Sequence, residues 1–192
     1  MTVKDAFLSL NPYSRPGCLR KEMKALIMHW TAVPNQPASQ VRDFFESRKG
    51  GKLGYGSAHY IVDLDGFIIR CIPEGEVAYH VGSGQIDPAS RKIYTDWARA
   101  KFGEAATDPN TIGPNICTLG IEMCPSDADG NFRDATLKSA VELAADICLR
   151  LALNPLEDIA THHLVVGWKC CPKLWTDHPE KLDEFRRAVK SL

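Results

Sequence analysis

Lys24-Ala-Leu-Ile-Met-His-Trp30 is a short apolar run that ends in polar groups, and it indicates the fold class of the chain. A run of this length and composition is typical of a buried β-strand. A turn follows at residues 34–37, and residues 39–48 then predict a helix with Ser39 as its N-cap and Val41 facing inward. A buried strand that leads into a helix indicates a domain in which the two element types alternate.

Further strands and helices alternate along the rest of the chain. Apolar and β-branched runs predict strands at residues 58–63, 67–72, 77–81, 116–123 and 159–165, with a hairpin at residues 64–66. Helices are expected at residues 91–102, 136–151 and 179–192. We therefore predict an α/β fold, in which a single domain has a central mixed β-sheet flanked by helices.

The domain boundaries follow from the distribution of turn-forming residues. Residues 1–23 are rich in them and are expected to form an N-terminal lead-in segment, so that the domain itself comprises residues 24–192. No internal repeat or linker divides it. The segment 83–115 is long, polar and interrupted by glycine and proline. A connection of this length is more often functional than incidental, and one hypothesis is that it walls a substrate groove.

Composition and charge exclude several classes of function. The chain has 192 residues, of which 44% are hydrophobic and 24% charged, as in a globular domain with one core. The net charge of −1 and the lack of a basic run argue against a nucleic-acid partner. No stretch is apolar enough to insert into a membrane, and the N-terminus lacks the features of a secretory signal. We therefore expect a cytoplasmic protein as synthesised, with its oligomeric state left open.

The seven cysteines are irregularly spaced and odd in number, which argues against a disulfide framework. Most of them should be small buried apolar residues, but at least one is a candidate metal ligand.

Histidines and cysteines near predicted strand ends offer ligands for a metal ion. A catalytic zinc site needs three protein ligands and one open position. The candidates are His29, the pair His162-His163 and the sequence Cys170-Cys171-Pro172. Adjacent residues on a strand point to opposite faces, so only one of the two paired histidines can face a given site. Spacing alone does not select a ligand set, because residues so far apart are more often unrelated.

Five motifs together resemble a known family. They are Met28-His-Trp-Thr-Ala32, Ser57-Ala-His-Tyr-Ile-Val62 with Asp65-Gly66, Ala78-Tyr-His-Val-Gly82, Leu119-Gly-Ile-Glu-Met123, and His163-Leu-Val-Val-Gly-Trp-Lys-Cys-Cys-Pro172. Their order is similar to that of the type-2 N-acetylmuramoyl-L-alanine amidases, a family of phage lysins, bacterial autolysins and animal peptidoglycan recognition proteins. The resemblance runs from about Leu26 to Pro172, which is most of the chain.

The resemblance implies one zinc ion held by His29, His163 and Cys171. In that family the ligand cysteine lies eight positions after the second histidine, is usually followed by proline, and has a lysine two positions before it. Cys171, Pro172 and Lys169 match this pattern. His163 is then the inward ligand, and His162 and Cys170 are expected to be outward-facing neighbours.

The resemblance also assigns the remaining site residues. Glu122 looks like the general base, and Lys169 like the group that stabilises the developing oxyanion. His80 resembles a histidine that supports a ligand or contacts substrate, and we expect it to bind substrate. His59 is expected to be a hydrogen-bonded structural residue. One branch of the family has a catalytic tyrosine where this chain has Ala58, which makes Glu122 more necessary.

The function that the resemblance implies is zinc-dependent cleavage of the amide bond between N-acetylmuramic acid and L-alanine in peptidoglycan. An endolysin or other lytic enzyme, acting on the cell wall once released, is the expected role. A peptidoglycan-binding module without activity and a cytoplasmic amidase that recycles muropeptides are the alternatives. A different zinc hydrolase such as a peptidase is less favoured, because the chain has no His-Glu-x-x-His pair.

Overall fold

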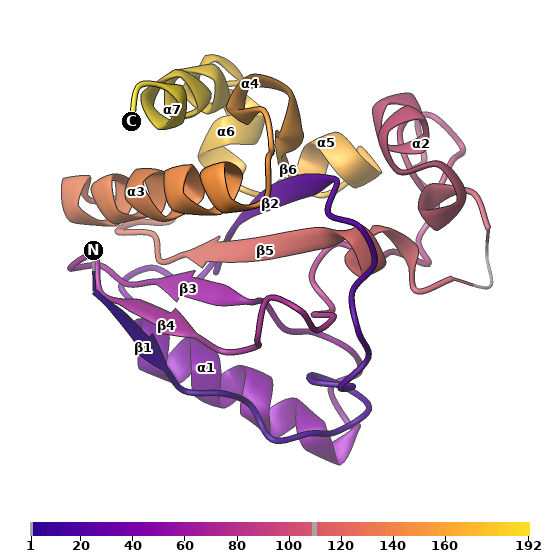
Figure 1. Ribbon diagram of the computed structural model, residues 1–192, viewed down its shortest axis with the longest axis horizontal. Coiled ribbons are helices and arrows are strands. Elements are labelled where there is room, and N and C mark those ends of the chain that lie inside the picture. The colour runs from indigo at the N-terminus through magenta and orange to yellow at the C-terminus, as the bar shows by residue number, and fades with distance from the viewer. Residues whose placement is uncertain (1, 109–110) are drawn as a thin grey trace.

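The computed structural model describes residues 2–108 and 111–192, and it is built on one six-stranded sheet (Figure 1). The strands are β1 (Val3–Asp5), β2 (Ala25–Trp30), β3 (Tyr60–Val62), β4 (Ile68–Arg70), β5 (Thr118–Met123) and β6 (Ile159–Thr161). Their order in the sheet is β1-β4-β3-β5-β2-β6, and every neighbouring pair is parallel except β3 with β4. The mixed sheet in a single domain confirms the predicted fold class.

Helices lie on both sides of this sheet (Figure 1). The α-helices are α1 (Ala38–Ser47), α2 (Asp96–Phe102), α3 (Asp134–Arg150), α4 (Pro155–Asp158), α5 (His162–Val166), α6 (Lys173–Asp177) and α7 (Glu180–Lys190). Short 3-10 turns occur at η1 (Arg48–Gly50), η2 (Gly103–Ala106) and η3 (Gly113–Cys117). No helix in the described part of the chain has the length and apolar character that a bilayer crossing requires.

Strand alternation divides the core between the two faces of the sheet. Successive side chains of a strand point to opposite faces, so Leu26 and Met28 of β2 face one side and Ile27 and His29 the other. The first side packs against α3 and α7 in the largest apolar cluster. This side contains only apolar contacts from the central strands and positions no candidate site residue.

The second face carries two separate apolar clusters with a polar strip between them. One cluster joins α1 to β3 and β4, and the other joins α2 and α5 to β2. Between them, β2 and β5 present His29, Thr118 and Glu122 on this same face. The sheet therefore separates a fully apolar side from a side that can hold a functional site.

The strand predicted at residues 159–165 is wrong in its second half. β6 ends at Thr161, and α5 begins at the next residue. The Thr161 hydroxyl accepts a hydrogen bond from the Leu164 backbone N–H at 3.1 Å, which is the usual N-cap interaction. The chain thus turns into a helix at His162, a change that decides which histidine faces the site.

Four other local predictions differ from the structure. Residues 77–81 form no strand, because their hydrogen bonds go to loops, for example from Val77 N–H to Cys18 O at 2.9 Å. The helix predicted from residue 91 begins at Asp96, where the Thr95 side chain caps it. The N-cap of α1 is Pro37, not Ser39. The lead-in segment contributes the edge strand β1.

Candidate metal centre

The candidate site lies where three parallel strands end side by side. β6, β2 and β5 are neighbours, and their carboxyl ends reach the same edge of the sheet. His29 near the end of β2 is in register with Glu122 near the end of β5. His162 follows β6 directly. Carboxyl ends of parallel strands are a common place for functional side chains to converge.

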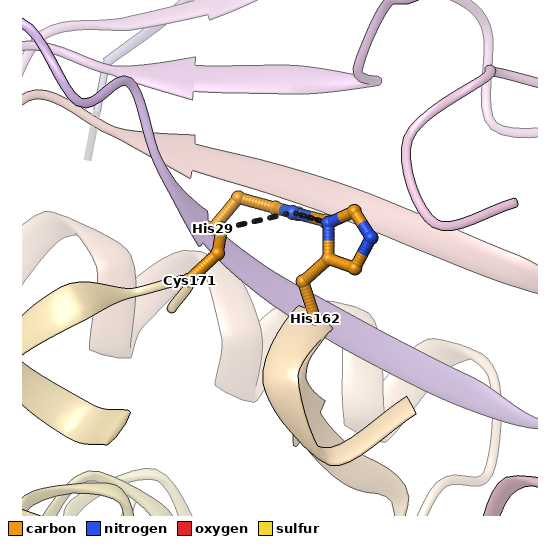
Figure 2. Close-up of side chains that lie close together, drawn as sticks. All are labelled: His29, His162 and Cys171. Atoms are coloured by element: carbon orange, nitrogen blue, oxygen red, sulfur yellow. Dashed lines mark hydrogen bonds between the residues drawn. The ribbon is translucent and has the colours of Figure 1, made fainter. Parts of the chain in front are cut away.

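His29, His162 and Cys171 point toward one another (Figure 2). Their candidate ligand atoms all lie within 4.8 Å of one another. His29 Nδ1 is 3.3 Å from His162 Nδ1 and 3.6 Å from Cys171 Sγ. All three residues are buried, with exposures of 1%, 4% and 3%. The three come from β2, from the start of α5 and from the loop that leads to α6 (Figure 2).

The two separations from His29 Nδ1, to His162 Nδ1 and to Cys171 Sγ, fit a tetrahedral zinc ion. With zinc–nitrogen bonds of about 2.0–2.1 Å and a zinc–sulfur bond of about 2.3 Å, two nitrogens should lie about 3.3 Å apart and nitrogen and sulfur about 3.6 Å apart. These are the separations that the structure has. No fourth histidine, cysteine or carboxylate of the described residues joins the group. The donor set therefore leaves one coordination position for a substrate or solvent molecule.

The prediction that His163 faces the site is wrong, and its neighbour His162 takes that place. The prediction followed the eight-position spacing between histidine and cysteine in the similar family, and it placed both histidines on a strand, where adjacent side chains point to opposite faces. In the helix that begins here, consecutive side chains are instead turned by about a quarter of a circle. His163 is partly exposed, and its Nδ1 lies 3.2 Å from the Lys169 carbonyl oxygen. Cys171 is buried as predicted, while Cys170 is exposed.

Burial sets the protonation of the three donors when no cation is bound. It lowers the pKa of His29 well below its usual range, with His162 contributing next. Burial, with the charge of Lys169, lowers the pKa of His162 to about 3. Burial and the nearby Glu122 raise the pKa of the Cys171 thiol to about 12. The centre thus holds neutral imidazoles and a neutral thiol, and a bound cation would favour the thiolate.

Glu122 is a partly buried residue with one buried and unpaired carboxyl oxygen. Its Oε2 makes no hydrogen bond to any of the described residues. Burial raises its pKa to about 8, and the positive charge of Lys169 opposes that rise. A buried and unpaired carboxyl group is costly to maintain, and such groups are concentrated at functional sites.

A cleft of about 830 Å³ opens beside the centre, and the predicted catalytic residues Glu122 and Lys169 line it. Glu122, His162, Cys171 and the exposed Lys169 all line it. The aromatic lining residues are Trp30, Phe44, Phe45, Tyr55, Tyr79 and Tyr94. Residues near both ends of the segment 83–115 also line this cleft, and residues 109 and 110 lie outside the described part. The hypothesis that the segment walls a substrate groove stays a prediction.

His80 contacts His29 instead of presenting a free nitrogen to the cleft. Its Nδ1 lies 3.0 Å from His29 Nε2, and its Nε2 lies 3.1 Å from Thr118 Oγ1. Both ring nitrogens are therefore engaged by protein atoms. The ring has no polar atom left for a substrate, so the geometry does not fit the predicted substrate contact and fits the supporting role instead.

His59 is a structural residue, as predicted. The Gly120 backbone N–H donates to His59 Nδ1 at 3.1 Å, so the other nitrogen of a neutral ring carries the proton. His59 Nε2 then donates to the Glu76 carbonyl oxygen at 3.0 Å. Burial lowers the pKa of His59 to about 4, which keeps the ring neutral.

Two supporting residues were missed by the sequence reasoning. Thr118 contacts His80, and the Asn115 side-chain oxygen accepts hydrogen bonds from the backbone N–H groups of residues 80, 81 and 82 at 3.0, 2.8 and 3.2 Å. No sequence motif marks either residue, because each reaches its partner only through the pairing of distant segments.

The chain is similar to known proteins in sequence and in fold. The sequence profile of the N-acetylmuramoyl-L-alanine amidase family matches residues 19–174. The probable N-acetylmuramoyl-L-alanine amidase of Bacillus licheniformis is 33% identical over 186 residues, which are 97% of this chain and 46% of the relative. The amidase BlyA of Bacillus subtilis (strain 168) is 30% identical over 187 residues, with the same coverage of 97% and 46%. The chain thus spans about half the length of these relatives.

A solved structure of a mutant endolysin from Bacillus subtilis has a similar fold. The TM-score is 0.68 with 21% sequence identity, and the alignment covers 98% of this chain and 99% of that one. At this level of identity the similarity concerns the fold alone.

Proposed function

This chain belongs to the N-acetylmuramoyl-L-alanine amidase family, and on that premise we propose that it hydrolyses the amide bond between N-acetylmuramic acid and L-alanine in peptidoglycan with one zinc ion. The observation that carries the proposal is the buried group of His29, His162 and Cys171 beside an unpaired glutamate in an open cleft. A binding module has no need for a buried carboxyl group with an unsatisfied oxygen at this place.

The zinc ligands in this proposal are His29 Nδ1, His162 Nδ1 and Cys171 Sγ. Two imidazoles and one thiolate suit zinc, and three protein donors are the number found in catalytic sites. When bound, zinc supplies Lewis acidity that polarises the amide carbonyl and makes a water molecule nucleophilic near neutral pH. The protein's own contribution is to hold His162 Nδ1 and Cys171 Sγ at the required separations from His29 Nδ1 before the ion arrives.

Glu122 is the general base and then the general acid. Its carboxylate accepts a proton from the attacking water, and the carboxylic acid donates that proton to the amide nitrogen as the carbon–nitrogen bond breaks. The products are the carboxylate of the muramic acid side chain and the free amine of L-alanine. Burial raises the pKa of Glu122 to about 8 in the metal-free protein, and a bound cation nearby would lower it toward neutrality, where a single carboxyl can serve in both directions.

Lys169 stabilises the negative charge that develops on the carbonyl oxygen during attack. Its ammonium group borders the cleft and acts electrostatically on His29, His162 and Glu122, whose pKa values it lowers. A fixed positive charge near the reacting carbonyl is a usual means of stabilising such an oxyanion.

The aromatic lining and open shape of the cleft suit a glycan strand with an attached peptide. Aromatic rings supply flat apolar surfaces for sugar faces and side chains, and the polar ends of segment 83–115 offer hydrogen-bonding groups on one rim. We include a lytic role, that of an endolysin, in this proposal.

The test uses purified sacculi and the full chain with stoichiometric zinc. We expect new amino groups to appear on L-alanine alone, detected by labelling the free amines and identifying the labelled residue. Cys171→Ser should abolish the release, because a hydroxyl is a far poorer zinc ligand, whereas the matched variant Cys170→Ser should retain it. Labelled amines elsewhere in the stem peptide would indicate a peptidase, and binding to sacculi without new amines would indicate a binding module.

A further inference from the structure

A continuous chain of buried hydrogen bonds runs from a backbone carbonyl to the candidate ligand His29. Thr118 Oγ1 lies 2.8 Å from the Pro114 carbonyl oxygen and 3.1 Å from His80 Nε2. His80 Nδ1 in turn lies 3.0 Å from His29 Nε2. His80, Thr118 and His29 are 8%, 0% and 1% exposed, so water does not compete for these contacts.

The chain has a fixed direction because a carbonyl oxygen can only accept. The single hydroxyl hydrogen of Thr118 is used in the bond to Pro114, so Thr118 Oγ1 must accept from His80 Nε2–H. His80 Nδ1 then has a free lone pair in the neutral ring. That lone pair accepts from His29 Nε2–H, which leaves His29 Nδ1 without a proton.

The reverse direction has a clear cost. If Thr118 donated to His80, the hydroxyl oxygen would face the Pro114 oxygen at 2.8 Å with no hydrogen between them. His29 Nδ1 would then carry a proton and point it at His162 and Cys171. A protonated nitrogen cannot bind a metal, so the donor group would be incomplete.

We propose that Thr118 and His80 are positioning residues that hold His29 as its Nε2–H tautomer and so present Nδ1 to a metal ion. The inference rests on the proposed function only in taking His29 Nδ1 as a ligand atom. Metal-binding histidines are commonly oriented through their second nitrogen by a carboxylate or a carbonyl group. Here the partner is a second neutral histidine, whose own tautomer is set by a threonine.

The sheet is shaped to admit the His80 ring at this place. Gly120 of β5 has no side chain, and a Cβ there would lie 2.6 Å from His80 Cγ. The Asn115 side chain holds the backbone of residues 80–82 through three hydrogen bonds. Gly120 of β5 thus leaves room for the ring, and the loop that carries Asn115 holds the backbone of His80 in place. Together they keep His80 Nδ1 close to His29 Nε2.

The first test measures the tautomers in the metal-free wild type by long-range ¹H–¹⁵N correlation of the histidine rings. We expect protons on Nε2 and none on Nδ1 in both His29 and His80. A His29 ring that carries its proton on Nδ1 would overturn the proposal without any substitution.

The second test compares Thr118→Val, which removes the hydroxyl in a similar volume, with Thr118→Ser, which keeps it. Thr136→Val is the matched control, because Thr136 is also fully buried and donates to a carbonyl oxygen, that of Asp63, on the apolar side of the sheet. Zinc affinity is measured by competition with a chelator, without substrate. Loss of an outer partner such as His80, in His80→Phe, is expected to weaken zinc binding by about 10- to 100-fold.

Thr118→Val should also weaken zinc binding, and it should allow the second tautomer of His80 to appear. Thr118→Ser should keep the zinc affinity and the His80 tautomer of the wild type. Equal zinc affinities in Thr118→Val and Thr136→Val, with unchanged tautomers, would refute the positioning role. Because neither measurement uses peptidoglycan, a chain that failed to cleave sacculi would leave this result standing, and the two proposals fail separately.

Discussion

Replacing Glu122 by glutamine is expected to stop amide hydrolysis and yet to stabilise the metal-free protein at high pH. The Glu122 side chain is partly buried beside the cleft, its Oε2 has no hydrogen-bond partner among the described residues, and burial raises its pKa to about 8 from the ordinary 4.5. Ionising it inside the protein is therefore much less favourable than ionising it in the unfolded chain. Glutamine has nearly the same shape and never ionises.

The magnitude follows from the two pKa values. Between about pH 4.5 and about pH 8 the unfolded chain has lost the proton while the native protein retains it, so the unfolded state binds fewer protons and native stability falls as pH rises. A pKa difference of about 3.5, at about 1.36 kcal/mol for each pKa unit, corresponds to roughly 5 kcal/mol above pH 8. Below pH 4.5 both side chains are neutral, and the two proteins should differ little.

The assay is urea unfolding followed by tryptophan fluorescence, with a chelator present, at a series of pH values across this window. The free energy of unfolding of Glu122→Gln minus that of the wild type should grow steadily with pH and then level off. Glu22→Gln, which alters an exposed glutamate, should show no comparable growth. In the zinc-loaded enzyme the same Glu122→Gln variant should keep its metal and lose about 10²- to 10⁴-fold in rate.

A stability difference that stays constant with pH would refute the reasoning, because it would mean that the Glu122 carboxylate is not desolvated in the native protein. A Glu122→Gln variant that is less stable than the wild type at high pH would contradict the predicted sign.

Three further perturbations test other parts of the site. His162→Ala should lose stoichiometric zinc while His163→Ala retains it, as measured by elemental analysis after gel filtration, and the opposite pattern would show that the other histidine is the ligand. Lys169→Met should lower kcat by about 10²- to 10³-fold. It should also move the acidic limb of the pH–rate profile to higher pH, since Lys169 lowers the pKa of Glu122. An acidic limb at the wild-type pH would show that Lys169 does not act on Glu122. Phe102→Ala should lower the free energy of unfolding by about 3–5 kcal/mol in denaturant titration, because Phe102 is 1% exposed in the cluster beneath α2, and a cost near zero would show that this cluster contributes little.

The periodic parts of the fold could be predicted from the sequence. The buried strand around Ile27 and the long helix α3 were found because their patterns are local and strong. The strand predicted at residues 77–81 failed because its backbone N–H groups bond to a loop carbonyl and to the Asn115 side chain, partners that the local pattern does not contain. The edge strand β1 was missed because three exposed residues carry no alternation.

The site residues that belong to a sequence motif could be predicted. The residue whose orientation depends on where a helix begins could not. His29, Glu122 and Cys171 were identified through motifs, and all three border one centre or its cleft. The choice of His163 followed the eight-position spacing between histidine and cysteine in the similar family. It failed because the chain turns into a helix at His162, and this residue, not its neighbour, joins His29 and Cys171. The role of Thr118 could not be predicted from the sequence, because its partner His80 lies 38 positions away along the chain.

X-ray absorption spectroscopy at the zinc edge, on the substrate-free protein, tests most directly whether these side chains form an open hydrolytic metal site. We predict one zinc ion per chain, one sulfur neighbour at about 2.3 Å, and nitrogen or oxygen neighbours at about 2.0–2.1 Å that include two imidazoles. A shell with two sulfurs, a shell without sulfur, or a third imidazole that closes the fourth position would contradict the account.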